Sequence, residues 1–239
     1  MKLYTSKLLK VKHTFTCREG GVSKAPYSSL NLAFHVGDKR DDVIKNHKIL
    51  ANFLDYDFKK LVFMNQIHSN IVVVVDDDFF SIPSCDALVT NKKDTPLMIM
   101  SADCTPVLFY DEKQEVISVA HVGRAGAFGD IISNVINIMI DKFESNPKDI
   151  KVAIGPSIKS CCYEVSQKEI DEAKNLGYSF ACSGMFLDIN AIISNQLEKN
   201  GIDSENIDII DVCTKCSSDK FFSYRDEKTT GRNAGVIVL

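Results

Sequence analysis

The hydrophobic residues of this chain gather in short runs that are typical of β-strands. Each run is rich in β-branched or aromatic residues and is bounded by turn-forming residues. Two of the runs flank the polar segment 111–115 and predict a hairpin. The runs are Leu61–Phe63, Ile71–Val75, Leu97–Met100, Val107–Tyr110, Val116–Ala120, Lys151–Ile154, Ile207–Val212 and Gly235–Leu239.

Other segments repeat apolar residues every three or four positions, as amphipathic helices do. One more helix is expected to open at Ser166 and Glu169, which form a capping-box pattern. Hairpin and crossover signals are mixed, and nothing marks an internal boundary. We therefore expect an α+β fold with mixed β-sheets flanked by helices, formed as a single domain over residues 1–239. The periodic segments are Asp41–Leu54, Asp130–Phe143 and Asp188–Asn200.

Composition places the chain among ordinary globular proteins. It has 239 residues, 45% of them hydrophobic and 25% charged, which excludes disordered and collagen-like classes. Its longest aliphatic run, Ile71–Val75, is far shorter than the roughly 20 apolar residues of a membrane helix. Lysines interrupt the first twelve residues, so no signal-peptide core forms and we expect a cytoplasmic protein.

Charge argues against two classes of partner. The formal net charge is −4, and the sequence contains no basic run. Binding to a nucleic-acid backbone or an anionic membrane requires a basic face. We therefore expect a small-molecule ligand and neither a nucleic-acid nor a membrane partner.

The eight cysteines show one Cys-X-X-Cys motif, at Cys213 and Cys216. A cytoplasmic protein keeps such thiols reduced. A structural zinc site normally combines two pairs of this kind, and the sequence has no second pair. The spacing therefore favours incidental thiols, and we interpret Cys161 and Cys162 as packing residues.

Three residues stand where functional side chains are often found, at strand ends and in loops. His68 lies between two strand-like runs, His121 follows the run 116–120, and Cys104 precedes Pro106, which predicts a break in the strand. Their separations in the sequence are long, so spacing alone leaves open whether they converge.

The other histidines have ordinary structural interpretations. His47 lies on the apolar stripe of a predicted helix, which favours a core role, and His13 lies in a polar N-terminal segment. His35 lies in the loop before that helix, where organising the loop and contacting a substrate are both consistent with the sequence.

A glycine-rich segment, Gly123–Gly126, follows the run 116–120 and precedes a helix predicted from about Gly129. A helix N-terminus attracts anions, and Arg124 could add a bidentate contact. A tight turn explains the glycines equally well.

Ten short motifs occur in an order that resembles the bacterial YfiH/YlmD-like family, from about residue 14 to the C-terminus. This family was long labelled multicopper polyphenol oxidase (laccase) and is now described as purine nucleoside phosphorylase with adenosine deaminase activity. The motifs are Gly20–Ser23, Ser29–Leu32, Asn65–His68, Cys85–Thr90, Ala102–Pro106, Ala120–Gly123, Ile154–Ile158, Cys161–Val165, Ser223–Asp226 and Thr230–Arg232.

The resemblance implies a zinc ion held by His68, Cys104 and His121, which would then be the catalytic residues, with copper as a non-native occupant. Three protein ligands leave a fourth position open, and zinc there lowers the pKa of bound water or polarises a substrate atom. The implied activity is a transferase reaction, phosphorolysis of adenosine, inosine and methylthioadenosine, together with hydrolytic deamination of adenosine.

Residues near the motifs are candidates for further roles. We expect Asn31, His35 and Arg124 to contact the substrate, and Asp103 or Glu164 to serve as the acid/base carboxylate that zinc deaminases add.

The chain departs from the family pattern in two places. The family usually reads His-Ala-Gly-Trp-Arg-Gly around the second histidine, whereas this chain has no tryptophan and places Arg124 one position earlier. The second arginine of the usual Ser-Tyr-Arg-Arg-Asp is also absent after Arg225. We expect these two changes to affect the substrate preference and the rate of phosphorolysis, while the metal set is intact.

Three other functions compete with this interpretation. A copper phenol oxidase would use the same ligand types, but a multicopper centre needs more imidazoles than the five histidines supply. A metal-free cysteine hydrolase would use Cys104 as its nucleophile, activated by His68 or His121. A non-catalytic nucleotide-binding module would bind nucleosides without turnover.

Overall fold

The structure is a computed structural model that describes residues 3–76 and 81–239. Two mixed sheets form its centre, and a small hairpin of β10 (Cys182–Ser183) and β11 (Phe186–Leu187) lies apart from them. The six-stranded sheet has the order β12 (Ile207–Ile209), β9 (Ile150–Ile154), β7 (Thr105–Asp111), β8 (Val116–Val122), β5 (Ala87–Thr90) and β4 (Val72–Val74). The five-stranded sheet has the order β1 (Leu3–Tyr4), β2 (Lys12–Thr16), β13 (Asn233–Val238), β6 (Leu97–Ser101) and β3 (Val62–Phe63).

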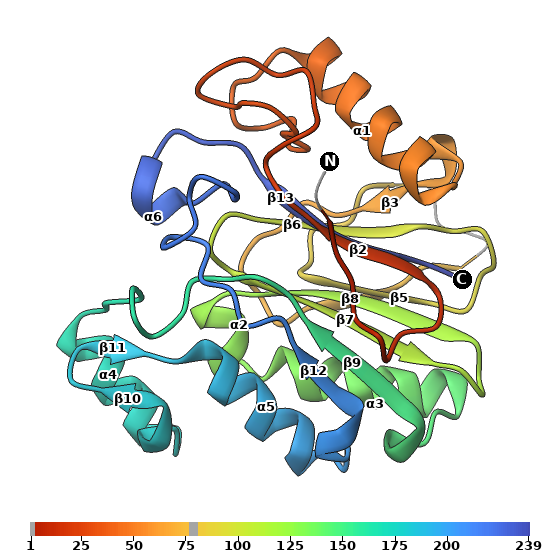
Figure 1. The fold of residues 1–239 in the computed structure, drawn as a ribbon. Coiled ribbons are helices and arrows are strands. Elements are labelled where there is room, and N and C mark those ends of the chain that lie inside the picture. The colour runs from red at the N-terminus through yellow and green to blue at the C-terminus, as the bar shows by residue number, and fades with distance from the viewer. Residues whose placement is uncertain (1–2, 77–80) are drawn as a thin grey trace.

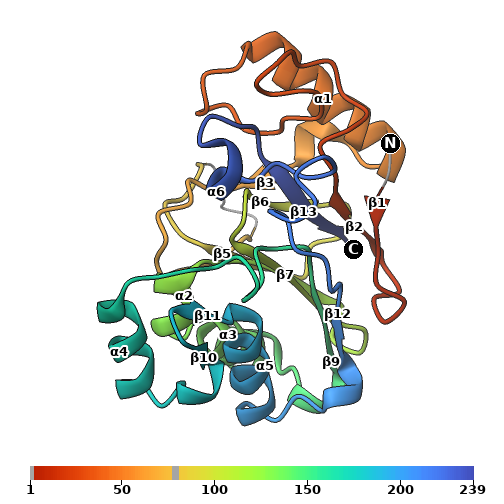
Figure 2. The ribbon, with the colours of Figure 1, turned by 60° about the vertical axis from the view of Figure 1, so that its left-hand side comes forward.

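The two sheets lie face to face between two layers of helices (Figures 1 and 2). The helix α1 covers the outer face of the five-stranded sheet, and α2, α3 and α5 lie on the side of the six-stranded sheet, with α4 beside them. The helices are α1 (Arg40–Leu54), α2 (Arg124–Phe128), α3 (Ile131–Phe143), α4 (Gln167–Asn175), α5 (Ile189–Lys199) and α6 (Tyr224–Glu227).

Alternation along the strands builds three hydrophobic layers. In β7, Leu108 faces the opposite sheet, whereas Phe109 packs against the helices. In β6, Ile99 faces the opposite sheet, whereas Met98 packs toward α1. Because successive side chains point to opposite faces, strands covered on both faces are apolar throughout, which explains the continuous runs in the sequence.

The α+β expectation is confirmed, and every predicted strand run and helix corresponds to an observed element. The hairpin is confirmed as the antiparallel pair β7–β8. The capping box of Ser166 and Glu169 opens α4, and α5 ends just before Gly201, whose φ is +85°. The pattern missed β5, whose four residues are all buried, and it also missed the two-residue strands β1, β10 and β11.

One expectation about a break in the chain is wrong, and one of two interpretations left open for the glycine-rich segment is excluded. Strand β7 continues through Pro106, whose carbonyl oxygen accepts a hydrogen bond from the Gly155 N–H. The missing N–H of Pro106 faces the same side, toward Gly155 and one residue beyond the end of β9, so the proline lies at the end of this ladder. The segment after Gly123 is not a tight turn, because Arg124 already begins α2.

The chain passes from one sheet to the other between β6 and β7, through the turn 102–104. The loop after β3, the end of β8 and the segment before β13 meet this turn at the same edge of the two sheets. Within residues 3–76 and 81–239, no helix has the length and apolar character needed to cross a bilayer.

Candidate metal centre

The structure brings His68, Cys104 and His121 together from three separate elements. His68 lies in the loop after β3, Cys104 in the turn between the sheets, and His121 in β8. One ligand atom from each residue lies within 4.8 Å of the other two. The Cys104 Sγ is 3.9 Å from His68 Nε2, and the imidazole centroids are 4.9 Å apart.

A buried carboxylate, that of Asp86 directly before β5, fixes both histidines. Its Oδ1 lies 2.9 Å from His121 Nδ1 and accepts a hydrogen bond from the His68 backbone N–H. Its Oδ2 accepts from the N–H groups of Ile67 and Ser69 and from the Ser69 hydroxyl. Because a carboxylate only accepts, His121 donates from Nδ1, which leaves Nε2 on the side of Cys104.

The backbone around the site adopts conformations that need such support. His68 has φ +57°, a left-handed conformation that is uncommon for residues other than glycine. The three N–H groups that Asp86 accepts from belong to residues 67–69, so they hold His68 in this conformation. The Asp86 backbone carbonyl also accepts from the His121 N–H.

Position 123 leaves little room for a side chain because the site approaches the backbone there. A Cβ on Gly123 would lie 3.1 Å from Cys104 Sγ and 3.2 Å from His68 Cδ2. Such contacts are tighter than ordinary van der Waals contact, so the sulfur and the imidazole would have to shift by a few tenths of an ångström to admit a side chain.

The close packing of these groups shifts their protonation. Burial raises the pKa of Cys104, but the charge and hydrogen bonds of His121 and His68 outweigh burial and lower the pKa to about 6. Burial lowers the pKa of His121, but Cys104 and Asp86 outweigh it and raise the pKa to about 9. Without a metal, the pair is therefore a thiolate beside an imidazolium at neutral pH.

The donor set suits a transition-metal ion. Two imidazole nitrogens and one thiolate bind zinc or copper, and three ligands leave one position open. The contact of Asp86 with the distal nitrogen of His121 is the outer-shell interaction that orients metal-binding histidines. The residues present therefore fit a single metal ion.

A pocket of about 570 Å³ opens over the three ligands. This volume lies in the range of small-molecule sites. Apolar side chains form part of its wall, and His35, Tyr224 and Arg232 add polar groups. The lining residues are His35, Met64, Asn65, Gln66, His68, Met100, Ser101, Ala102, Cys104, His121, Tyr224 and Arg232.

Of the three residues expected to contact the substrate, Asn31 and Arg124 lie outside the pocket lining. Asn31 is fully buried and accepts a hydrogen bond from the Arg232 backbone N–H, so it supports the pocket wall from behind. Arg124 forms ion pairs with Glu169 and Glu172 of α4. Neither residue lines the pocket, whereas His35 does.

The two carboxylates considered as acid/base groups also lie outside the pocket lining. Asp103 accepts hydrogen bonds from the Thr214 hydroxyl and the Arg225 backbone N–H, and Glu164 is exposed on a neighbouring loop.

Both remaining histidines are structural: His13 accepts from the Ser6 N–H, and His47 donates to the Leu32 carbonyl from the core.

Sequence reasoning missed three residues of the site. Asp86, Tyr224 and Arg232 each lie in a motif that carries the family resemblance, which was the signal available. Their roles depend on contacts across distant segments, such as the hydrogen bond between Asp86 and His121.

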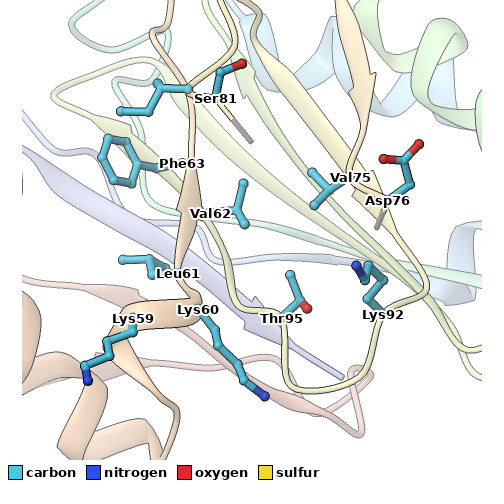
Figure 3. Close-up of a pocket in the computed structure, with 11 residues that line it drawn as sticks. Lys59, Lys60, Leu61, Val62, Phe63, Val75, Asp76, Ser81, Lys92 and Thr95 are labelled. Carbon is cyan, nitrogen blue, oxygen red and sulfur yellow. The ribbon is translucent and has the colours of Figure 1, made fainter. Parts of the chain in front are cut away.

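A second hollow, of about 440 Å³, lies beside β3 and shares no lining residue with the pocket over the ligands. Val62 and Val75 point into it, with Lys60 and Lys92 along one side (Figure 3). The described residues that line this hollow include no histidine or cysteine. We therefore assign the chemistry to the pocket over His68, Cys104 and His121.

The fold and the ligand set define an α+β protein with a candidate mononuclear metal centre at the edge of two packed sheets. The chain belongs to the family described as multi-copper polyphenol oxidoreductase laccase, which it matches over residues 12–239. This confirms the family resemblance seen in the sequence motifs.

Relatives and solved structures agree with this assignment. The chain is 34% identical to purine nucleoside phosphorylase YlmD of Bacillus subtilis over 93% of this chain and 86% of that protein. It is 36% identical to a purine nucleoside phosphorylase of Corynebacterium glutamicum over 96% of this chain and 94% of that protein. The crystal structure of Bacillus licheniformis YfiH superposes with a TM-score of 0.91 at 33% identity, covering 95% of this chain and 92% of that one.

We predict that Asp86→Asn weakens metal binding at this site by about 10- to 100-fold, the usual effect of losing an outer-shell partner. The amide would present an N–H group where the carboxylate now accepts. Competition with a chromophoric chelator measures the affinity for the metal ion. The ion bound at this site is identified as the one that is lost in the Cys104→Ala variant. Asp41→Asn, at an exposed position in α1, is the control; equal affinities for the two variants would contradict the role of Asp86.

Metal binding should also strengthen with pH. The ion must displace the proton from His121, whose raised pKa of about 9 keeps it protonated at neutral pH. We expect the affinity to rise about tenfold per pH unit between about pH 7 and 9 and to level off above that range. The same chelator competition, repeated across this range, tests the slope; a flat profile would contradict the thiolate–imidazolium pair.

Proposed function

We propose that this protein is a zinc-dependent purine nucleoside phosphorylase that also deaminates adenosine. The observation that carries the proposal is the ligand set of His68, Cys104 and His121 facing a pocket that also holds Arg232 and His35. The names of the relatives, which cover nearly the whole chain, support the same class of substrate. Adenosine and inosine are the proposed nucleosides, and methylthioadenosine is a further proposed substrate. We place the protein in the cytoplasm.

The pocket offers a suitable environment for a purine ring. Met64, Met100 and Ala102 supply apolar wall, and the aromatic residue Tyr224 is 51% exposed. An exposed aromatic ring can stack on a flat base, which adds to the area that burial removes from water. We assign Tyr224 to base stacking.

Arg232 and His35 are the proposed phosphate-binding residues. Burial lowers the pKa of His35, and the positive charge of Arg232 lowers it further. The two side chains therefore lie close enough to interact. Among the described residues, Arg232 uses only Nη1 for side-chain hydrogen bonds, to the carbonyls of Thr230 and Gly231. Its other guanidinium nitrogens therefore remain for an anion.

In the proposed reaction, a phosphate oxygen forms a bond to C1′ of the ribose as the bond from C1′ to the purine nitrogen breaks. The base leaves with the bonding electron pair and takes up the proton of hydrogen phosphate, and the products are the free base and ribose 1-phosphate. Arg232 and His35 would hold the phosphate against C1′. Zinc held by His68, Cys104 and His121 would supply positive charge and a polarising centre to the substrate.

Deamination is the second proposed activity of the same pocket. Water adds at C6 of adenine and ammonia leaves, which requires a group that passes a proton from one to the other. No aspartate or glutamate is among the described residues that line the pocket. His35 is the one lining imidazole outside the ligand set, and we assign the proton transfer to it.

The five histidines, all within the described part of the chain, argue against a multicopper oxidase. Two of them serve the ligand set, and His13 and His47 are hydrogen-bonded elsewhere in the fold. The site therefore provides ligands for one ion, and copper would occupy it only as a non-native ion.

One observation favours a second candidate, a cysteine hydrolase. The thiolate of Cys104, the raised pKa of His121 and the carboxylate of Asp86 reproduce the order of a Cys–His–Asp triad. A hydrolase of this kind would stay active after metal removal and would lose activity on thiol alkylation. His68 has no role in a triad, which favours the metal site.

The products formed from adenosine test the proposed function. With zinc-loaded protein and phosphate we expect adenine and ribose 1-phosphate, and without phosphate we expect inosine and no free base. Cys104→Ala should abolish both reactions while leaving the far-ultraviolet circular dichroism unchanged, and Cys182→Ala is the matched control. Base release without phosphate, or near wild-type turnover by Cys104→Ala, would contradict the proposal.

Replacing Arg232 should act on phosphate in particular. Loss of a charged hydrogen bond costs about 1.5–3 kcal/mol, so Arg232→Met should raise the KM for phosphate about 10- to 150-fold. Arg124→Met is the matched control, because Arg124 pairs with α4 outside the pocket. If Arg124→Met weakens phosphate use and Arg232→Met does not, the assignment of Arg232 is wrong.

A further inference from the structure

Four thiols outside the pocket form a second cluster. Cys161 and Cys162 lie in the loop between β9 and α4, and Cys213 and Cys216 lie in the segment between β12 and α6. One sulfur from each residue lies within 4.8 Å of the other three. The Cys216 Sγ is 3.3 Å from Cys162 Sγ and 3.7 Å from Cys161 Sγ.

These contacts change the interpretation of the Cys-X-X-Cys motif. The missing second pair is the adjacent Cys161 and Cys162, which the fold brings to Cys213 and Cys216 from about 50 residues away. The expectation that Cys161 and Cys162 are packing residues is wrong, because Cys161 is exposed and Cys162 is only half-buried.

The spacing of the sulfurs matches one tetrahedral ion. With zinc–sulfur bonds of about 2.3 Å, the sulfurs of a four-thiolate site lie about 3.8 Å apart. The observed separations fall around this value. An iron–sulfur cluster would hold some or all of its four thiolates farther apart, because they are distributed over two or four iron atoms.

Backbone groups contact the sulfur of Cys213. The backbones of Cys216 and Lys159 form hydrogen bonds with this thiol. Such N–H···S contacts orient metal-binding thiolates and lie outside the ligand shell.

We propose that Cys161, Cys162, Cys213 and Cys216 hold a second metal ion, zinc, in a structural site. Four protein ligands leave no open position, so this ion takes no direct part in catalysis. The site is independent of the ligand set in the pocket, because it uses none of the same residues.

The two segments that this ion would join also hold the turn that carries Cys104. The Thr214 hydroxyl donates to Asp103 Oδ1 and the Ile158 N–H donates to the Asp103 carbonyl, so each segment contacts Asp103. Asp103 has φ +96° and directly precedes Cys104. The second ion would therefore clamp the two loops that keep the Cys104 turn in its left-handed conformation.

The test is the zinc content of protein purified without chelators, measured by inductively coupled plasma mass spectrometry. We expect two ions per chain in the wild type, one in Cys216→Ser, one in Cys104→Ala and none in the double variant. Cys182→Ser, which removes a half-buried thiol outside both sets, should keep both ions. One ion in both the wild type and Cys216→Ser would overturn the second site and leave the proposed function untouched.

Cobalt substitution of Cys104→Ala protein gives a readout that does not require the Cys216 variant to fold. The remaining ion should show the intense sulfur-to-cobalt charge-transfer absorption of a tetrahedral four-thiolate site. Absence of that absorption would overturn the proposal. So would a Cys162–Cys216 disulfide in the native protein, detected as thiols that resist alkylation after chelation and react only after reduction.

Discussion

One buried carboxylate determines the geometry of the candidate metal centre. Asp86 is fully buried, and its two oxygens serve three backbone N–H groups, one hydroxyl and one imidazole. A buried charge is costly unless it is paired and hydrogen-bonded, and here the partners are the loop of His68 and the ring of His121. Burial raises the pKa of Asp86, but these partners outweigh it and lower the pKa to about 2. The carboxylate therefore stays ionised across the physiological range and keeps both ligands in place.

The two-sheet architecture explains why the ligands come from distant parts of the chain. His68, Cys104 and His121 reach one edge of the molecule because the chain leaves the five-stranded sheet after β6 and enters the six-stranded sheet at β7. The rigid layers on both sides hold the edge open as a pocket, while the left-handed residues His68 and Asp103 turn the backbone into it. Local strain at these positions is compensated by Asp86 and by the loops that contact Asp103.

Much of the architecture could be predicted from local patterns. The buried strands and amphipathic helices follow from side-chain periodicity, and the ligand triad followed from the family resemblance. Pro106 misled the prediction because its effect depends on which neighbour its missing N–H faces. Asp86 could not be assigned from the residues around it, since its partner His121 is 35 positions away. The four-thiol cluster was missed for the same physical reason: Cys161 and Cys162 meet Cys216 only through the packing of two loops.

Anomalous X-ray diffraction at the zinc absorption edge, from crystals of protein purified without added metal or chelator, tests the central claim most directly. The claim predicts a peak about 2.0–2.3 Å from His68 Nε2, Cys104 Sγ and His121 Nε2, the usual zinc–ligand distances. Asp86 should lie against the far nitrogen of His121 in the same map. The absence of an anomalous peak between these three side chains, or a histidine ring turned away from the sulfur of Cys104, would contradict the account.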